Sequence, residues 1–214
     1  MKKVFVIFTL SILTLSTVLA QSAFWVDIQK NSSITINGTT NINSFKLIQS
    51  GERLLKRDFT INATQSQNKV VISRNMQSIT VKDFHSNNKL ALRGFLKLVK
   101  ADVYPTFHVR LNSFETDLKV INKDVSKANA SIDITITGKT IQYTIPVTSY
   151  REGDSFVLKG TEKLNIRDFG LEPPVEMMGL IKVNEWISID FNIVCKINAC
   201  RNSPGAKILS EAKE

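Results

Sequence analysis

Apolar and polar residues alternate along most of this 214-residue chain with a period of two, which is typical of β-strands. The clearest stretch runs from Ser131 to Val147, where Ile132, Ile134 and Ile136 alternate with Asp and Thr. Gly138 then supplies a turn, after which a second apolar set alternates with Thr and Gln. This pattern predicts a β-hairpin with one dry face and one wet face.

The same alternation recurs on both sides of this hairpin. One segment departs from it, because the apolar residues between Asn87 and Lys100 have helical spacing and follow Asn and Ser residues that could cap a helix. Pro105 prevents that helix from continuing. We therefore predict an all-β fold in which one antiparallel sheet curls round an apolar interior, with one short helix at about 87–100.

The beginning of the chain is typical of an export signal. Lys2 and Lys3 precede an apolar stretch that is short and diluted by Ser and Thr, and Val18-Leu19-Ala20 suits signal peptidase. A membrane anchor is the alternative, which the short apolar length disfavours. We expect an exported protein, periplasmic or extracellular, with three parts: a signal peptide at 1–20, one β domain at 21–197 and a C-terminal tail at 198–214.

Two cysteines, Cys195 and Cys200, lie near the end of the last predicted strand. An oxidising compartment would allow them to form a disulfide. An extended strand would hold them too far apart, so pairing requires a bend after Ile197. The sequence leaves the disulfide and the free thiols open.

The formal net charge is +9, and removing the two lysines of the signal leaves +7. Lys and Arg are scattered along the chain, without an Arg-rich run or the aromatic signature of an RNA-binding sheet. We therefore expect no nucleic-acid partner. Peripheral contact with a membrane stays open, as does the oligomeric state.

Signals for catalysis are poor. The two histidines, His85 and His108, lack metal-ligand spacing, and neither a nucleophile elbow nor a phosphate-binding Gly-rich loop is present. Asp168 and Glu172 share a predicted loop and are best explained as solvated charges. We predict no catalytic residue, no metal and no enzyme activity. An enzyme would need polar groups such as His108, Glu162 and Arg93 to meet inside the sheet.

Glu162 is an anomaly, because its position in the alternation matches that of Phe156, Leu158 and Leu164. A carboxylate on the inner face of a sheet must be hydrogen-bonded or lie near water. A β-bulge at Gly160 would instead turn it outward, and we favour the bulge.

Several motifs follow one another along the chain in a recognisable order. They are Trp25-Val-Asp27, Asp102-Val-Tyr104-Pro105-Thr-Phe107, the hairpin from Ile134 to Val147 with Gly138 and Pro146, Leu164-Asn-Ile-Arg-Asp168-Phe-Gly170, and Gly179-Leu-Ile-Lys-Val183 followed by Ile189-Asp-Phe191. In this order the motifs resemble the YceI-like family of polyisoprenoid-binding proteins, and the similarity extends from about Trp25 to Val194. Many members carry His in the first two strands, where this chain has Asn, Ser and Thr. The resemblance therefore assigns no contact with a ligand headgroup to these two strands.

The resemblance implies a single antiparallel eight-stranded lipocalin-like barrel whose lumen holds a long-chain apolar small molecule. An isoprenoid quinone or a polyprenyl phosphate would be such a ligand, and no other cofactor is expected. Cationic groups at the mouth would suit a phosphate. Candidate ligand-binding residues are the apolar strand residues on the inner side of the alternation, one residue of the helix and a Met pair in a loop. They are Phe95, Phe107, Val109, Ile132, Ile134, Ile136, Tyr143, Ile145, Phe156, Leu158, Met177, Met178, Ile189 and Phe191.

The protein would then be an exported carrier or buffer of an isoprenoid-like lipid. The alternative is a non-catalytic structural or interaction module of the cell envelope, with a barrel filled by its own side chains. Alternation alone predicts the same residues inside in both cases.

Overall fold

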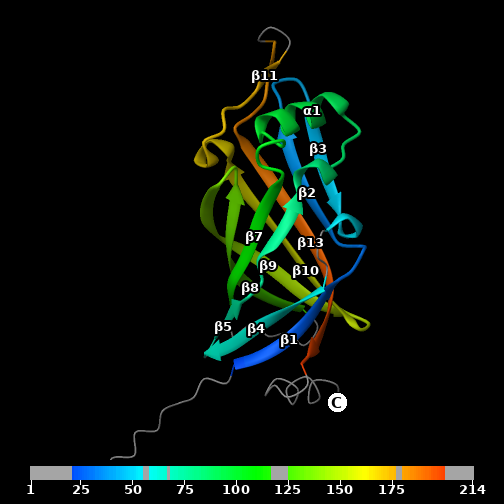
Figure 1. The fold of residues 1–214 in the computed structure, drawn as a ribbon, viewed down its shortest axis with the longest axis vertical. Helices are drawn as coiled ribbons and strands as arrows, with labels where there is room; N and C mark the ends of the chain where they lie inside the picture. Colours follow the sequence, from blue (N-terminus) through cyan, green and yellow to red (C-terminus); the bar gives the residue numbers. More distant parts are fainter. Residues whose placement is uncertain (1–20, 55–57, 67, 117–124, 177–179, 201–214) are drawn as a thin grey trace, which may run out of the picture.

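The computed structural model describes residues 21–54, 58–66, 68–116, 125–176 and 180–200. The predicted signal peptide at 1–20, the Met177–Met178 pair and most of the predicted tail therefore lie outside the described residues. The described residues form β-strands and one α-helix, α1 (Figure 1). The strands are β1 (Gln21–Ile28), β2 (Ser33–Thr39), β3 (Ser44–Ser50), β4 (Asp58–Ser66), β5 (Lys69–Ser73), β6 (Gln77–Thr80), β7 (Thr106–Thr116), β8 (Val125–Ile136), β9 (Lys139–Glu152), β10 (Ser155–Asn165), β11 (Val175–Glu176), β12 (Ile181–Lys182) and β13 (Trp186–Ala199).

Eight antiparallel strands close into a barrel, which confirms the predicted fold. Their order round the barrel is β1-β4-β5-β7-β8-β9-β10-β13, and pairing of β1 with β13 completes the ring. Because β1 pairs with both β4 and β13, no strand of this ring is a free edge strand.

The sheet extends beyond this ring through β2, β3 and β6. The long strand β13 pairs with β1 along its C-terminal half and with β2 along its N-terminal half. β2 pairs with β3, β6 pairs with β7, and a backbone bridge between Ile48 of β3 and His85 connects the two sides. The barrel is therefore long, and β1, β4 and β5 lie at one end while β2, β3 and α1 lie at the other (Figure 1).

The β8–β9 hairpin forms as the sequence predicts, with Ile136 opposite Lys139. Thr137 and Gly138 make the turn with positive φ angles of 48° and 81°, as a two-residue hairpin turn requires. Gly tolerates this conformation without steric cost. The turn therefore fixes the register that places Ile132, Ile134 and Ile136 on the inner face.

Helix α1 (Lys89–Leu98) begins and ends within two residues of the predicted range. Its N-cap is Asn88, whose side-chain oxygen accepts a hydrogen bond of 3.0 Å from the backbone N–H of Ala91. Its apolar face packs on the core through aromatic contacts, since Phe95 lies 5.4 Å from Phe84 and 6.1 Å from Phe107 between ring centroids. The helix thus covers one end of the barrel.

Of the two possibilities that the sequence leaves open for the cysteines, the structure shows the free thiols and not the disulfide. Strand β13 continues without a bend to Ala199, and both Cys195 and Cys200 are free thiols in this structure. Burial, and secondarily Asp27, raises the pKa of Cys195 to about 11. A thiol with so high a pKa carries almost no thiolate at neutral pH, so Cys195 is a packing residue.

Candidate functional site: the barrel lumen

A cavity of about 690 Å³ runs inside the barrel. Inward side chains of β8 form one wall, with Ile132, Ile134 and Ile136 in a row. Side chains of β13 form another, and α1 contributes Phe95 and Leu98. The alternation that predicts the strands therefore also builds the wall, because successive inward residues on a strand point into the same space.

Most of the candidate residues from the sequence line this cavity. They are Phe95, Phe107, Val109, Ile132, Ile134, Ile136, Ile145, Phe156, Leu158, Ile189 and Phe191.

Tyr143 is the exception among the described candidates, because it is not one of the residues that line the cavity. β9 and β10 pair only as far as Val147 and Gly160, and beyond that point they separate. The short 3₁₀ helix Ile166–Phe169 contacts β9 in this region, and the ring of Phe169 stacks on Tyr143 at 6.4 Å. The tyrosine is therefore enclosed in the wall, where burial, followed by Asp168 and Glu162, raises its pKa to about 12.

Glu162 lines the cavity, so the predicted outward bulge is wrong. The register between β10 and β13 continues unbroken through Gly160, with Glu162 opposite Ile189. No extra residue shifts the strand, and the alternation carries the carboxyl inside. Burial raises the pKa of Glu162 above its ordinary value, because the charged form loses hydration in an apolar wall.

Gly160 has a different role from the predicted bulge. A Cβ atom at this position would lie 2.3 Å from the ring of Phe191, its neighbour on β13. Gly38 and Phe45 form the same kind of pair between β2 and β3, at 2.2 Å. Each glycine lets an inward phenylalanine lie flat against the wall, where a larger residue would push the ring into the lumen.

Sequence reasoning missed the lining residues at the end of the barrel formed by β1, β4 and β5. They are Val26, Ile28, Phe59, Ile61 and Ile72. The same alternation marks them, but these strands are short and hold few apolar positions each. Their closure onto β13 and β7 becomes visible only once the sheet is paired.

The lumen contains almost no charge. Among the described lining residues Glu162 is the sole carboxylate, and Lys, Arg and His are absent. Two of the polar groups already serve the fold: Asn88 caps α1, and Asn75 exchanges hydrogen bonds of 2.5 and 2.9 Å with the backbone of Leu111. A ligand would therefore meet a surface that favours hydrocarbon and offers no cation for an anionic group.

The lining of the lumen meets the protein surface beside the β2–β3 connection. Asn43, in that connection, is the one exposed residue among the described residues that line the cavity. Neighbouring lining residues come from the start of α1 and from the segment round β12, such as Leu90 and Ile181. We call this region between α1, the β2–β3 connection and β12 the mouth.

The residues that an enzyme would need do not meet. His108 is on the outer side of β7, where Ser78 Oγ lies 3.0 Å from its Nδ1. Arg93 is exposed on α1, and Glu162 is in the lumen. In the described part of the chain, no cluster of His, Cys, Asp or Glu could hold a metal ion. Among those same residues, no helix has both the length and the apolarity to cross a bilayer.

A model of the YceI-like domain matches residues 25–195. The chain belongs to the YceI-like family. Solved structures similar to this YceI-like protein include a polyisoprenoid-binding domain from Saccharophagus degradans implicated in plant cell wall breakdown, with 10% identity, 82% of this chain and 98% of that chain covered, and a TM-score of 0.55.

Two further structures are more distantly similar. They are BcnA of Burkholderia cenocepacia (13% identity, 81% and 95% covered, TM-score 0.45) and the YceI protein of Campylobacter jejuni (14%, 61% and 71%, TM-score 0.42). No curated protein matches the sequence significantly. The structural likeness shows the fold, and family membership favours binding over catalysis.

Proposed function

We propose that this YceI-like protein is an exported, non-catalytic carrier or buffer that holds a long isoprenoid-like molecule in its lumen. The observation that carries the proposal is the cavity of about 690 Å³ with an apolar wall. This volume falls within the range of roughly 300–1,000 Å³ that is usual for small-molecule sites. The similar domain described as polyisoprenoid-binding supports the same ligand class.

The physical reason for such a carrier is the cost of hydrating a hydrocarbon chain. Each apolar Å² exposed to water costs about 25 cal/mol, so a long isoprenoid does not cross an aqueous compartment alone. Lining residues such as Ile134, Phe107 and Ile189 replace that water with hydrocarbon contacts. The alternative of a barrel filled by its own side chains predicts no such space.

The charge of the lumen favours one headgroup over another. A phosphate inside the barrel would find no cation among the described lining residues and would face Glu162. An uncharged head such as a quinone has no such penalty, and a phosphate would have to stay at the mouth. An isoprenoid quinone therefore fits the lumen better than a polyprenyl phosphate does.

Organic extraction of the purified full chain followed by mass spectrometry tests the proposal. We expect about one long apolar molecule per protein. Ala128 lines the cavity from β8, and Asn129 next to it is exposed. Ala128→Trp should lower the extracted amount at least ten-fold by filling the lumen, whereas the matched change Asn129→Trp should leave it unchanged. Wild-type protein without any apolar molecule, and unable to take up added isoprenoid quinone, would reject the carrier.

A further inference from the structure

The outer side of α1 carries a row of positive charges beside the mouth. Lys89, Arg93 and Lys97 are exposed, and their spacing of four residues places them on one side of the helix. Lys100, just beyond the end of the helix, is exposed as well. The three helical cations span about 12 Å. The helix contains no acidic residue. Its opposite side, including Phe95, faces the lumen, so α1 stands between the lumen and this basic row.

Exposed apolar side chains lie at the same end of the barrel. Ile42, Val175 and Leu180 are exposed by 64%, 58% and 72%. Asn41 holds two of their segments together, because its side-chain amide donates to the carbonyl of Leu180 at 2.9 Å and accepts from the backbone N–H of Lys182 at 2.9 Å. Figure 1 shows α1, β3 and β11 at one end of the molecule, opposite β1. We call Ile42, Val175 and Leu180 the rim.

The cations of this end exceed the acids that could neutralise them. Described acidic side chains here include Asp102, which pairs with Lys82, and Glu172 and Glu185, which both pair with Arg167. Asp83 and Asp168 are the other two. They face the three cations of α1 together with Lys100, Lys46 and Lys182. None of these six cations makes an ion pair among the described residues, so an excess of positive charge faces solvent.

We propose that this end of the barrel docks on an anionic phospholipid bilayer, with the rim inserted among the headgroups and the α1 cations on lipid phosphates. Charge complementarity selects the partner, because basic side chains next to exposed apolar ones match an anionic interface. The mouth then opens onto the bilayer, and an apolar molecule passes between membrane and lumen without crossing water. The docking goes beyond the proposed function and rests on it only for the cargo.

Co-sedimentation with vesicles tests the docking. The full chain is mixed with vesicles of phosphatidylcholine alone or of equal parts phosphatidylcholine and phosphatidylglycerol. We expect binding to the anionic vesicles that weakens as salt is raised. Each cation near such a surface contributes about five-fold in affinity, so Arg93→Gln/Lys97→Gln should weaken binding about 25-fold.

The matched control removes the same charge from the opposite end. Lys127 lies near the start of β8 opposite Thr148, and Lys196 lies on β13 opposite Asp27 of β1; both are exposed. Lys127→Gln/Lys196→Gln should leave binding within about two-fold of wild type. Ile42→Ser should reduce binding by up to about ten-fold, because one exposed aliphatic side chain no longer inserts. Circular dichroism establishes that each variant is folded.

Either of two results overturns the docking. One is the absence of binding to anionic vesicles at low salt, which would leave the α1 cations for another partner such as an acidic protein. The other is an equal loss in the two double variants, which would show net charge alone at work. Lipid extraction is a separate measurement, so an empty lumen with intact vesicle binding rejects the carrier and keeps the docking, and the converse result does the reverse.

Discussion

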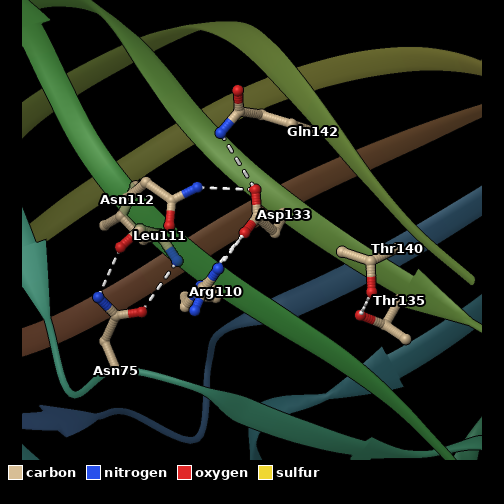
Figure 2. A network of polar contacts seen from close by, with 8 residues as sticks. All are labelled: Asn75, Arg110, Leu111, Asn112, Asp133, Thr135, Thr140 and Gln142. Atoms are coloured by element: carbon tan, nitrogen blue, oxygen red, sulfur yellow. Dashed lines mark hydrogen bonds and ion pairs between the residues drawn. The ribbon is translucent and has the colours of Figure 1, made fainter. Parts of the chain in front are cut away.

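The two faces of β8 are built on different principles. On the inner face Ile132, Ile134 and Ile136 border a hollow, so part of their surface touches no protein atom. On the outer face the side chain of Asp133 is enclosed by polar partners from two neighbouring strands (Figure 2). The strand thus leaves its apolar side incompletely packed and makes its polar side complete.

The outer contacts of Asp133 are closely spaced. Arg110 donates to one carboxylate oxygen at 2.6 and 3.2 Å, while Asn112 and Gln142 donate to the other at 2.7 and 3.2 Å. Asp133 is only 9% exposed although it lies on the outer face. The difference between the two faces shows that polar contacts on the outer face can stabilise a barrel, so the inner face need not be fully packed and can hold a ligand.

The strongest test of this contrast compares two leucines on β10. Leu164 is 1% exposed and does not border the cavity, whereas Leu158 lines it. Leu164→Ala should lower the free energy of unfolding by about 3–4 kcal/mol, because a new void forms in packed surroundings. Leu158→Ala should cost only about 1–2 kcal/mol, since its side chain already borders a void. Urea denaturation measures both, and equal losses would mean that the lumen is packed as tightly as the rest of the core.

The outer network gives the second test. Asp133→Asn should lower the free energy of unfolding by about 1–3 kcal/mol at neutral pH, because Arg110 loses its charged partner and one amide donor faces another. Extracted ligand should be unchanged, since Asp133 points away from the lumen. A loss of ligand without a loss of stability would contradict the division between the two faces.

The pH dependence of this effect has a definite sign. Burial alone would raise the pKa of Asp133, but hydrogen bonds from Arg110, Asn112 and Gln142 outweigh it and hold the pKa below its ordinary value. A carboxyl whose pKa is lowered by folding stabilises the protein fully above the unfolded value of about 3.9 and loses this contribution as pH falls through the folded value. Wild type and Asp133→Asn should therefore converge in stability in acid.

The sequence could predict the strands and the helix because their signals are local. The alternation from Ile132 to Ile136 and the turn at Gly138 each lie within a few residues, and pairing in the structure follows them. The helix is predictable for the same reason, from its own spacing and from Asn88. Local signals of this kind decide the fold class.

The contents of the barrel could not be predicted, because inward residues are the same in a hollow and a filled barrel. The enclosure of Tyr143 depends on the separation of β9 from β10, which no pattern in either strand marks. The Asp133 network was likewise invisible, since Arg110, Asn112 and Gln142 meet it only when three strands are in register. The hollow lumen, the enclosure of Tyr143 and the Asp133 network all depend on interactions between segments that are distant in the sequence.

Glu162 provides the finest test, because it is the residue that breaks the apolar pattern of the inner face. Its pKa is raised by burial, so folding favours the protonated form. Such a group binds more protons in the folded state, and stability falls as pH rises from about 4.3 through the folded pKa. Glu162→Gln removes this cost and should stabilise the protein at neutral pH by less than about 1 kcal/mol, after allowance for solvent screening, with no effect in strong acid.

Urea denaturation at several pH values measures this change, and Glu152→Gln, an exposed glutamate at the end of β9, is its matched control. If Glu162→Gln increases stability at neutral pH but not in acid, the charge of Glu162 lies against an apolar wall. A loss of stability at neutral pH would instead mean that the carboxylate is solvated and useful, and that water enters the lumen at the level of Ile189, its neighbour on β13. In that case a hydrocarbon chain would not occupy this part of the barrel, because the same water would have to leave first.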